Sequence, residues 1–342
     1  MRIGLITHTT GGRGGIERVV ELQAAGLRAR GHTVDLVTGP ELGSGWIARA
    51  VAAAGLAFRR GRALRRFDVL LAHYQPSPWL AQRSGVPTVH YFHMPVRALH
   101  PTTQQRTNPG YRAWAVLCRP LERIDRSSVA AAAEVAFPSP SVGRDLVGIY
   151  GRGGTLLPLG VDTSVFAPEP GQPGEHLLFA GRLGAPYKHL DWAIEVARRL
   201  GRPLHVVGEG TRPAVPDDAE VVFRGYLEGE KLAAAYRDAA VLLFPSAQED
   251  FGLVPLEAMA SGLPVVGWDD GHGPSLTLAV GSGGRLVAPY DLDAYTAAVE
   301  ELLGDGAERE RLAAAGPAWV RDRFSLDRHL DGLEQLLARA TA

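Results

Sequence analysis

The sequence is poor in cysteine and carries almost no net charge, and each shortage narrows the classes of protein to consider. Its single cysteine, Cys118, excludes an intrachain disulfide and lies in an apolar run, where it is expected to pack as a small hydrophobe. The 36 Lys and Arg residues balance 37 Asp and Glu residues, so no global basic field attracts nucleic acid or an anionic membrane. We therefore expect no nucleic-acid partner, and any polyanion site has to be local.

We also expect no targeting leader, because residues 3–6 already have the pattern of an apolar strand. Together with the lone cysteine this favours a cytoplasmic location. Five arginines form the densest basic cluster: Arg59, Arg60, Arg62, Arg65 and Arg66. A solvated helix face explains this cluster better than peripheral contact with a lipid surface or an anionic acceptor, although the second interpretation stays open.

Length, apolar content and periodicity predict an α/β protein of two domains. The 342 residues, 46% of them hydrophobic, are about twice a common domain length of ~150 residues. Short β-rich runs alternate with longer helical ones, a pattern typical of parallel sheets. In the first half the predicted strands cover residues 3–7, 33–38, 68–73 and 86–92, and the predicted helices cover 15–30 and 45–65. Gly31 can adopt the left-handed conformation and is expected to end the first helix.

A Pro- and Gly-rich stretch at residues 168–174 interrupts this pattern and is predicted to be the linker. Beyond it the predicted strands cover 177–180, 204–207, 221–223, 241–244 and 264–267, and the predicted helices cover 190–200, 230–238 and 255–261. We expect two doubly wound, Rossmann-like domains, residues 1–165 with a C-terminal crossover helix at 322–342, and residues 166–321. Open parallel sheets bind ligands beyond the carboxyl ends of their strands, so the two domains are expected to form one interdomain cleft.

The most informative stretch is PSAQEDFGLVPLEAMASGLPV at residues 245–265, directly after a predicted strand. It is typical of a loop, a helix and a further strand. Pro255 suits the first turn of a helix. The backbone amides of Gly252, Leu253 and Val254 are therefore expected at the positive end of this helix, where a phosphate or a sugar hydroxyl can accept them.

Two glutamates frame this helix start, Glu249 on the loop and Glu257 one turn inside the helix. Carboxylates placed in this way can each accept hydrogen bonds from a vicinal diol, one from a sugar ring and one from a ribose. The structural alternative is that Glu249 only caps the helix and that Glu257 is an ordinary surface residue.

The whole stretch resembles the signature of the retaining glycosyltransferase family conventionally numbered four (glycosyl transferases group 1). In that signature, PS-x-x-E-x-FG-x-x-x-LEAMA-x-G-x-PV, seven residues separate the two glutamates, as they separate Glu249 from Glu257. Segments at residues 14–18, 161–166, 181–188 and 283–287 extend the resemblance over nearly the entire chain. It implies a GT-B fold, a nucleoside diphosphate sugar as co-substrate, no metal or other cofactor, and transfer with retention to a small-molecule or oligosaccharide acceptor.

The resemblance also implies residue roles. Arg182 and Lys188 would neutralise the leaving diphosphate, whereas each alone would be typical of a solvated surface residue. His93, at a strand terminus where the family often has a histidine touching the donor sugar, completes a predicted catalytic set with Glu249, Arg182 and Lys188. The predicted donor-binding residues are Gly14, Gly15, Arg182, Lys188, Gly225, Tyr226, Glu249, Phe251, Gly252, Leu253, Val254 and Glu257.

Three other patterns have plainer explanations. The glycine-rich stretch 11–15 lets the backbone approach a phosphate at a helix start, but it is equally typical of a tight turn. It is no dinucleotide fingerprint, because Glu17 occupies the place of the third glycine. His90 and His93 are not expected to bind a metal, since strand positions three apart project to opposite faces. Asp291 and Asp293 precede a predicted helix at 295–303, which they are expected to cap.

The sequence departs from the family pattern at three places. Residues 271–275, Gly-His-Gly-Pro-Ser, stand where many relatives have a glycine pair, a proline and a glutamate. Leu159 replaces a common asparagine, and His189 stands where a glycine usually follows the lysine. The donor residues remain, but the acceptor side cannot be transferred from relatives.

Base, sugar and acceptor are not identified by these patterns. No carboxylate is evident as a nucleophile, so we expect same-face attack with the leaving phosphate taking the acceptor proton. The Ala-, Arg- and Gly-rich composition resembles that of an actinobacterium, and the first hypothesis is tailoring of an oligosaccharide (orthosomycin-type) antibiotic. The alternatives are a mannosyl- or glucosaminyl-type transferase of cell-envelope glycolipid or small-thiol biosynthesis, a nucleotide-sugar epimerase or hydrolase, a scaffold that only binds the donor, and a nicotinamide dehydrogenase.

Overall fold

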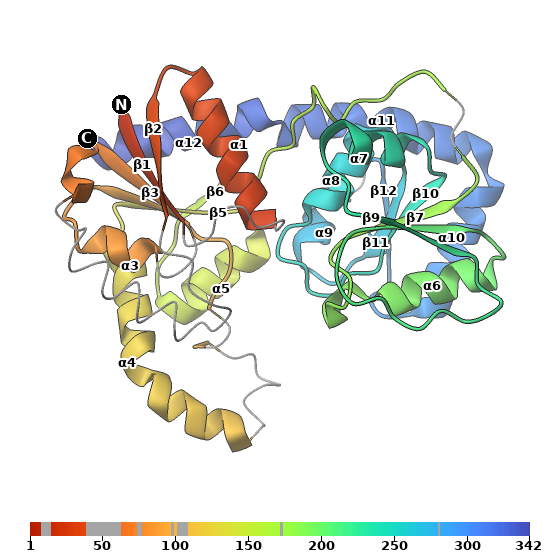
Figure 1. Cartoon of the computed structure of the whole chain (residues 1–342), viewed down its shortest axis with the longest axis horizontal. Coiled ribbons are helices and arrows are strands. Elements are labelled where there is room, and N and C mark those ends of the chain that lie inside the picture. Colours follow the sequence, from red (N-terminus) through yellow and green to blue (C-terminus); the bar gives the residue numbers. More distant parts are fainter. Residues whose placement is uncertain are drawn as a thin grey trace. The chain divides into compact units, whose positions relative to one another are not determined.

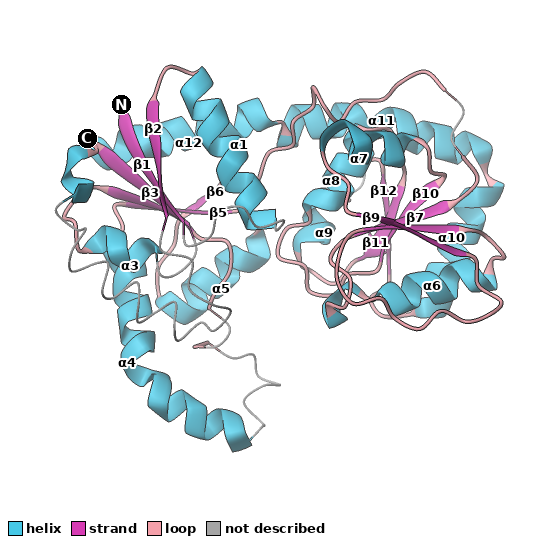
Figure 2. Cartoon of the chain, in the orientation of Figure 1, coloured by secondary structure: helices cyan, strands magenta, loops and turns pink. Residues whose placement is uncertain are grey.

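The structure, a computed structural model, describes residues 1–7, 15–38, 63–73, 77–96, 99–100, 109–171, 174–279 and 281–342, without the side chains of 109–118. The described chain divides into two compact units, Met1–Pro158 with His329–Ala342, and Leu159–Arg328. Each unit holds a six-stranded parallel sheet (Figure 1) with helices on both faces (Figure 2). The predicted α/β class and the two doubly wound domains are confirmed. Gly14, Arg59, Arg60, Arg62 and the side chain of Cys118 lie outside the described part.

The first unit has the sheet order β2-β1-β3-β4-β5-β6. Its strands are β1 (Arg2–Thr7), β2 (Thr33–Thr38), β3 (Val69–His73), β4 (Thr88–Tyr91), β5 (Glu134–Phe137) and β6 (Thr155–Leu156). Its helices are α1 (Gly15–Ala29), α3 (Ser77–Gln82), α4 (Pro109–Ala131) and α5 (Pro140–Tyr150), with a 3-10 turn, η1, at Ala63–Arg66. Gly31 ends α1 at a φ of 87°, as predicted.

The second unit has the sheet order β12-β11-β10-β7-β8-β9. Its strands are β7 (Leu177–Ala180), β8 (Leu204–Val207), β9 (Val221–Gly225), β10 (Val241–Phe244), β11 (Val265–Trp268) and β12 (Gly284–Val287). Its helices are η3 (Pro186–Lys188), α6 (Leu190–Arg199), α7 (Gly229–Arg237), α8 (Leu253–Ala260), α9 (Gly273–Thr277), α10 (Leu292–Gly304) and α11 (Gly306–Phe324). Asp291 caps α10 by accepting the amide of Ala294, as predicted, whereas Asp293 lies in the first turn of α10 and pairs with Arg199 at 2.6 Å.

The chain passes between the units at positions other than those predicted. The division falls after Pro158 and after Arg328, whereas the domain boundaries were predicted after residues 165 and 321. Contacts at the end of α7 hold the stretch around residues 168–174: Arg237 donates to the carbonyl of Ala167 at 3.3 Å, and the amide of Gly174 donates to the carbonyl of Asp238 at 3.1 Å. Residues 168–171 and 174 thus lie within the second unit, and the chain does not pass between the units there.

The last helix, α12 (Leu326–Thr341), belongs to the first unit from His329 onward. The isobutyl group of Leu330 occupies the space beside Gly26, where a Cβ atom would come within 2.3 Å of it. Arg30 contacts Asp331 and Glu334 of α12 at 2.7 Å each. Packing and ion pairs thus hold this helix against α1. The apolar stripe of α12 is buried in this contact, as the helical spacing of its leucines predicts.

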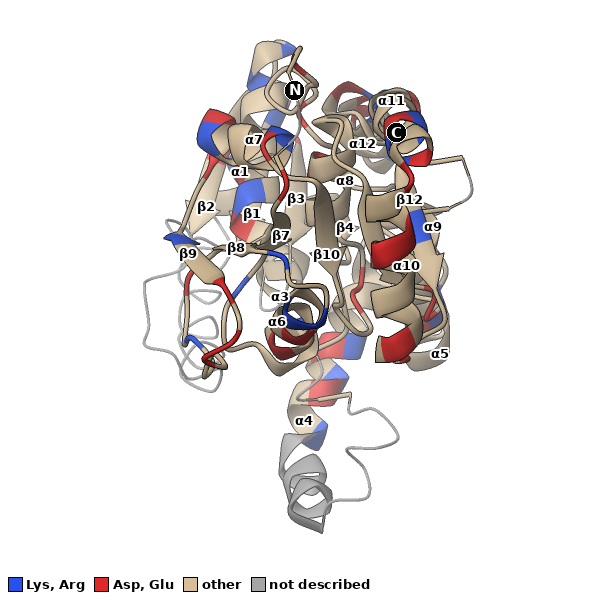
Figure 3. Ribbon diagram, turned by 90° about the vertical axis from the view of Figure 1, so that its right-hand side faces the viewer, with Lys and Arg blue, Asp and Glu red and all other residues tan. Residues whose placement is uncertain are grey.

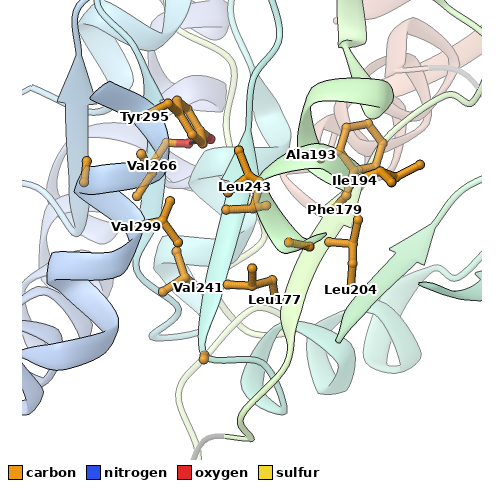
Figure 4. Close-up of a cluster of buried hydrophobic side chains, with 14 of the residues drawn as sticks. Leu177, Phe179, Ala193, Ile194, Leu204, Val241, Leu243, Val266, Tyr295 and Val299 are labelled. Carbon is orange, nitrogen blue, oxygen red and sulfur yellow. Dashed lines mark hydrogen bonds between the residues drawn. The ribbon is translucent and has the colours of Figure 1, made fainter. Parts of the chain in front are cut away.

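Apolar side chains on one face of the second sheet, among them Leu177, Val241 and Leu243, form a core with helix residues such as Tyr295 of α10 (Figure 4). The strands carry few charges, whereas helices and loops carry both signs side by side (Figure 3). Arg66 pairs with Asp35 at 3.0 Å and lies over the ring of Phe67.

No helix within the described ranges combines the length and apolarity needed to cross a membrane.

Candidate active site

The loop after β10 is fixed by partners from three other segments. Trp268 donates its indole N–H to the carbonyl of Pro245 at 2.9 Å, and the amide of Ala247 donates to the carbonyl of Tyr187 at 2.8 Å. Gln248 takes a left-handed φ of 50°, and its amide donates to the Asp270 carboxylate at 2.7 Å. This loop is therefore held in one strained conformation before any ligand arrives.

Lys188 and Glu249 form an ion pair beside this loop. Their side chains are 12% and 21% exposed, so both charges are partly withdrawn from water. The ammonium also lies 5.3 Å from the ring centroids of both Phe244 and Tyr187, a distance at which aromatic faces attract cations. The fold thus brings together two of the four predicted catalytic residues.

Helix α8 begins without a side-chain cap. Gly252 is its N-cap residue at a φ of 87°, and no side chain accepts an amide there. The alternative in which Glu249 only caps this helix is therefore wrong, because its carboxylate pairs with Lys188 instead. Leu253 and Val254 form the first turn, so their amides lie at the positive end of the helix as predicted.

Glu257 lies in the second turn of α8 and is 3% exposed. The phenol of Tyr236 on α7 donates to its carboxylate at 3.2 Å. The alternative that Glu257 is an ordinary surface residue is therefore wrong. A carboxylate this deeply buried must be held by hydrogen bonds, which fixes its orientation relative to α8.

Close backbone contacts interlock the ends of β7 and β8. A Cβ atom on Gly208 would lie 1.8 Å from the carbonyl oxygen of Gly181, and Leu183 donates its amide to Glu209 at 2.8 Å. Arg182 projects from this interlocked turn with an exposed side chain. Gly225 ends β9 at a φ of 72° and accepts the amide of Gly208 at 2.8 Å. Arg182 and Gly225, followed by Tyr226, thus gather at the carboxyl ends of β7 to β9.

The departure at His189 has a conformational explanation. His189 is in the left-handed region at a φ of 48°, where glycine is the unstrained residue. Its ring stacks on Trp192 with centroids 4.1 Å apart and an interplanar angle of 19°. Stacking therefore offsets part of the strain that a glycine would avoid.

His93 belongs to the first unit, two residues beyond β4, and is 6% exposed. Its Nε2 lies 2.9 Å from Nδ1 of His73, the last residue of β3. Burial lowers the pKa of His93 to about 3, and the nearby ring of His329 adds to this effect. The side chain is thus a neutral imidazole, as a hydrogen-bonding partner for a sugar would be. Gly15 starts α1 in the same unit, with no atom within 4 Å of the position of a Cβ.

The sequence did not indicate two partners of the predicted residues, His73 and Tyr236, or Asp270, which holds the loop at Gln248. His73 could have been found, because β3 and β4 are parallel neighbours and their carboxyl ends meet. Tyr236 and Asp270 carry no comparable signal, since their contacts depend on how α7 and the turn after β11 pack. Within the described residues, no group of three or more His, Cys, Asp or Glu side chains could hold a metal ion.

Comparison with known proteins agrees with this arrangement. Residues 13–165 match the family described as Glycosyltransferase Family 4, and residues 174–305 match Glycosyl transferases group 1. The D-inositol 3-phosphate glycosyltransferase of Acidothermus cellulolyticus is 30% identical over an alignment of 325 positions that covers 80% of this chain and 68% of that protein.

Two solved structures share the fold over the whole chain. The sucrose-phosphate synthase of Thermosynechococcus elongatus has a TM-score of 0.80 at 21% identity, covering 99% of this chain and 98% of its own. Anabaena HepE, solved in complex with UDP, has a TM-score of 0.75 at 15% identity, covering 99% and 100%. Fold and site together define an enzyme of the GT-B glycosyltransferase class. The chain belongs to the family 4 glycosyltransferases, the glycosyl transferases group 1.

Proposed function

We propose that this enzyme moves a sugar from a nucleoside diphosphate to a hydroxyl group of its acceptor, with retention at the anomeric carbon and without a metal. The observation that carries the proposal is the ion pair of Lys188 and Glu249 beside the uncapped start of α8. A cation for phosphate, an anion for sugar hydroxyls and free backbone amides lie next to one another there. That combination suits a sugar diphosphate.

The donor occupies the carboxyl ends of the strands in the second unit. Lys188 and the exposed Arg182 bind the diphosphate, so the charge that develops on the leaving group is neutralised as the glycosidic bond breaks. The carboxylate of Glu249 then accepts hydrogen bonds from sugar hydroxyls in place of its ion pair with Lys188. The amides at the start of α8 bind the sugar from the other side. Glu257, oriented by Tyr236, accepts the ribose hydroxyls. His93 keeps the role that the family resemblance implies, a hydrogen bond to the transferred sugar.

The acceptor oxygen attacks the anomeric carbon on the face that the phosphate leaves. The bond from the anomeric carbon to the diphosphate oxygen breaks, and the acceptor proton passes to that oxygen. The roles of two carboxylates next to the loop support this route over a covalent intermediate. Asp270 accepts the amides of Gln248 and His272, and Glu249 in this proposal binds hydroxyl groups of the sugar.

The names of relatives supply candidates for donor and acceptor. HepE binds UDP, so UDP is the first nucleotide to test. The Acidothermus relative is a D-inositol 3-phosphate glycosyltransferase, which favours a small phosphorylated polyol, in line with the small-thiol and glycolipid alternatives, over an antibiotic acceptor. Because the single cysteine suits a reducing compartment, a cytoplasmic location belongs to the same proposal.

The first test is thermal unfolding of the whole chain with UDP, GDP, dTDP and NAD. A ligand at a hundred times its dissociation constant adds about 2.7 kcal/mol of stability, so one nucleoside diphosphate should raise the unfolding temperature. The matching nucleotide sugar is then incubated with D-inositol 3-phosphate or with oligosaccharide acceptors. A glycosylated product with retained anomeric configuration is expected. Free sugar or an isomerised donor as the sole product would mean a hydrolase or an epimerase, and stabilisation by NAD alone would overturn the donor assignment.

A further inference from the structure

Two histidines at the ends of neighbouring parallel strands form a buried pair. Nδ1 of His73 and Nε2 of His93 are 2.9 Å apart, and the two rings are inclined by 31° with centroids 5.2 Å apart. The side chains are 0% and 6% exposed. Water therefore cannot replace this contact, and the hydrogen bond between the rings decides how His93 is oriented.

Both rings are neutral. Burial lowers the pKa of His93 to about 3 and lowers that of His73 well below its usual value, and the proximity of the two rings disfavours a charge on His73 further. Two neutral imidazoles at this distance share one proton, so one nitrogen donates and the other accepts. Which of the two donates determines the tautomer of His93.

The other nitrogen of His73 distinguishes the two arrangements. Nε2 of His73 is buried and has no hydrogen-bond partner among the described residues. If His93 donated, His73 would carry its own proton on that nitrogen and a buried N–H would be left unpaired. If His73 donates from Nδ1, only a lone pair is left unpaired there. Unpaired buried N–H groups are the rarer of the two in folded proteins.

We propose that His73 is a positioning residue that holds His93 as the Nδ1–H tautomer, so that His93 offers a hydrogen-bond donor to an oxygen of the donor sugar. This inference rests on the proposed function, in which His93 contacts the sugar. With Nε2 engaged and Nδ1 already protonated, His93 cannot act as the base that accepts the acceptor proton. That role is left to the leaving phosphate.

Three substitutions at His73 separate hydrogen bonding from packing. His73→Asn places an amide N–H close to the position of Nδ1 and keeps the donor. His73→Leu fills a similar volume without any donor. His73→Asp offers only an acceptor, which draws the proton of His93 to Nε2.

The direct measurement is the ring ¹⁵N spectrum of histidine-labelled protein, because protonated and bare ring nitrogens resonate far apart. Loss of signals in His93→Gln assigns the resonances of His93. We expect Nδ1 of His93 to be protonated in the unsubstituted protein and in His73→Asn, and the proton to move to Nε2 in His73→Asp. A proton on Nε2 in the unsubstituted protein, or a tautomer that none of the substitutions changes, would overturn the proposal.

Kinetics provide a second readout. Turnover should fall on the order of tenfold in His73→Leu, as expected for loss of one oriented hydrogen bond, with the KM of the acceptor unchanged and activity restored in His73→Asn. Equal losses in the Leu and Asn variants would mean a packing role and overturn the proposal. Full activity of His93→Gln would instead refute the sugar contact of the proposed function, whatever the spectra show for His73.

Discussion

Replacing Lys188 by methionine should separate the contribution of its charge to catalysis from the contribution of its charge to stability. Lys188 is paired with Glu249 and lies near the rings of Tyr187 and Phe244, and methionine keeps most of the packing while removing the charge. The chain offers a matched control, because its other lysine, Lys231, is exposed on α7. Lys231→Met removes the same charge from a side chain to which no role is assigned.

The structure sets the expected losses of activity and of stability in Lys188→Met. Loss of one group that stabilises developing charge costs roughly 3 kcal/mol, so kcat/KM should fall about a hundredfold. The pair is 12% and 21% exposed, between a surface pair worth about 0–1 kcal/mol and a buried pair whose breaking costs about 3–5 kcal/mol. We expect the free energy of unfolding to fall by about 2 kcal/mol, because the carboxylate of Glu249 is left unpaired.

The double variant Lys188→Met with Glu249→Gln provides the decisive comparison. Removing both charges should recover about 1 kcal/mol of stability relative to Lys188→Met and should recover no activity. Urea unfolding and initial-rate assays with the donor identified by thermal unfolding measure the two quantities. If kcat/KM of Lys188→Met matches that of Lys231→Met, the phosphate assignment is refuted. If the double variant is no more stable than Lys188→Met, the ion pair is not what stabilises the loop.

Three further predictions concern single side chains. Glu257→Ala should abolish the rise in unfolding temperature caused by the nucleoside diphosphate, and a full rise in that variant would contradict a ribose contact. His189→Ala should lower the free energy of unfolding by about 1 kcal/mol in urea titrations, because the strain of the left-handed backbone remains and the stacking on Trp192 is lost. His189→Gly should be close to neutral, because glycine removes that strain. Equal losses in the two variants would refute this account. Burial lowers the pKa of both His90 and His93 to about 3 in the folded protein. Below a pH of about 6.5, the ordinary pKa of a histidine in the unfolded chain, the unfolded state therefore binds more protons than the folded state. The free energy of unfolding should fall by about 1.4 kcal/mol for each of these groups with every unit by which the pH is lowered. Urea midpoints at pH 7, 6 and 5 test this, and His90→Leu should flatten the slope.

Much of the fold could be predicted from local patterns. The strands at 33–38, 177–180, 204–207 and 241–244 have the predicted bounds, because each is a short β-rich run followed directly by a glycine or a proline. Gly31 and Asp291 end and begin helices as predicted, since a left-handed glycine and a capping carboxylate act on their own neighbours. The stretch at 245–265 located the candidate site for the same reason, as its residues are contiguous.

The boundaries of the units could not be predicted in this way. The Pro- and Gly-rich stretch at 168–174 resembles a linker in composition, but the chain passes between the units after Pro158. The difference arises because residues distant in the sequence hold this stretch: Arg237 donates to the carbonyl of Ala167, and Asp238 accepts the amide of Gly174. Composition reports local flexibility, whereas unit membership follows from such long-range pairs.

The sequence by itself determined the class of fold, the family and the identity of the candidate site residues, because these depend on periodicity and on contiguous motifs. Only the tertiary structure decided their partners and environments. It buried Glu257 against Tyr236, paired Glu249 with Lys188 and placed His73 against His93. Each of these contacts joins elements distant in the chain, and their register is set by how sheets and helices pack rather than by any local preference.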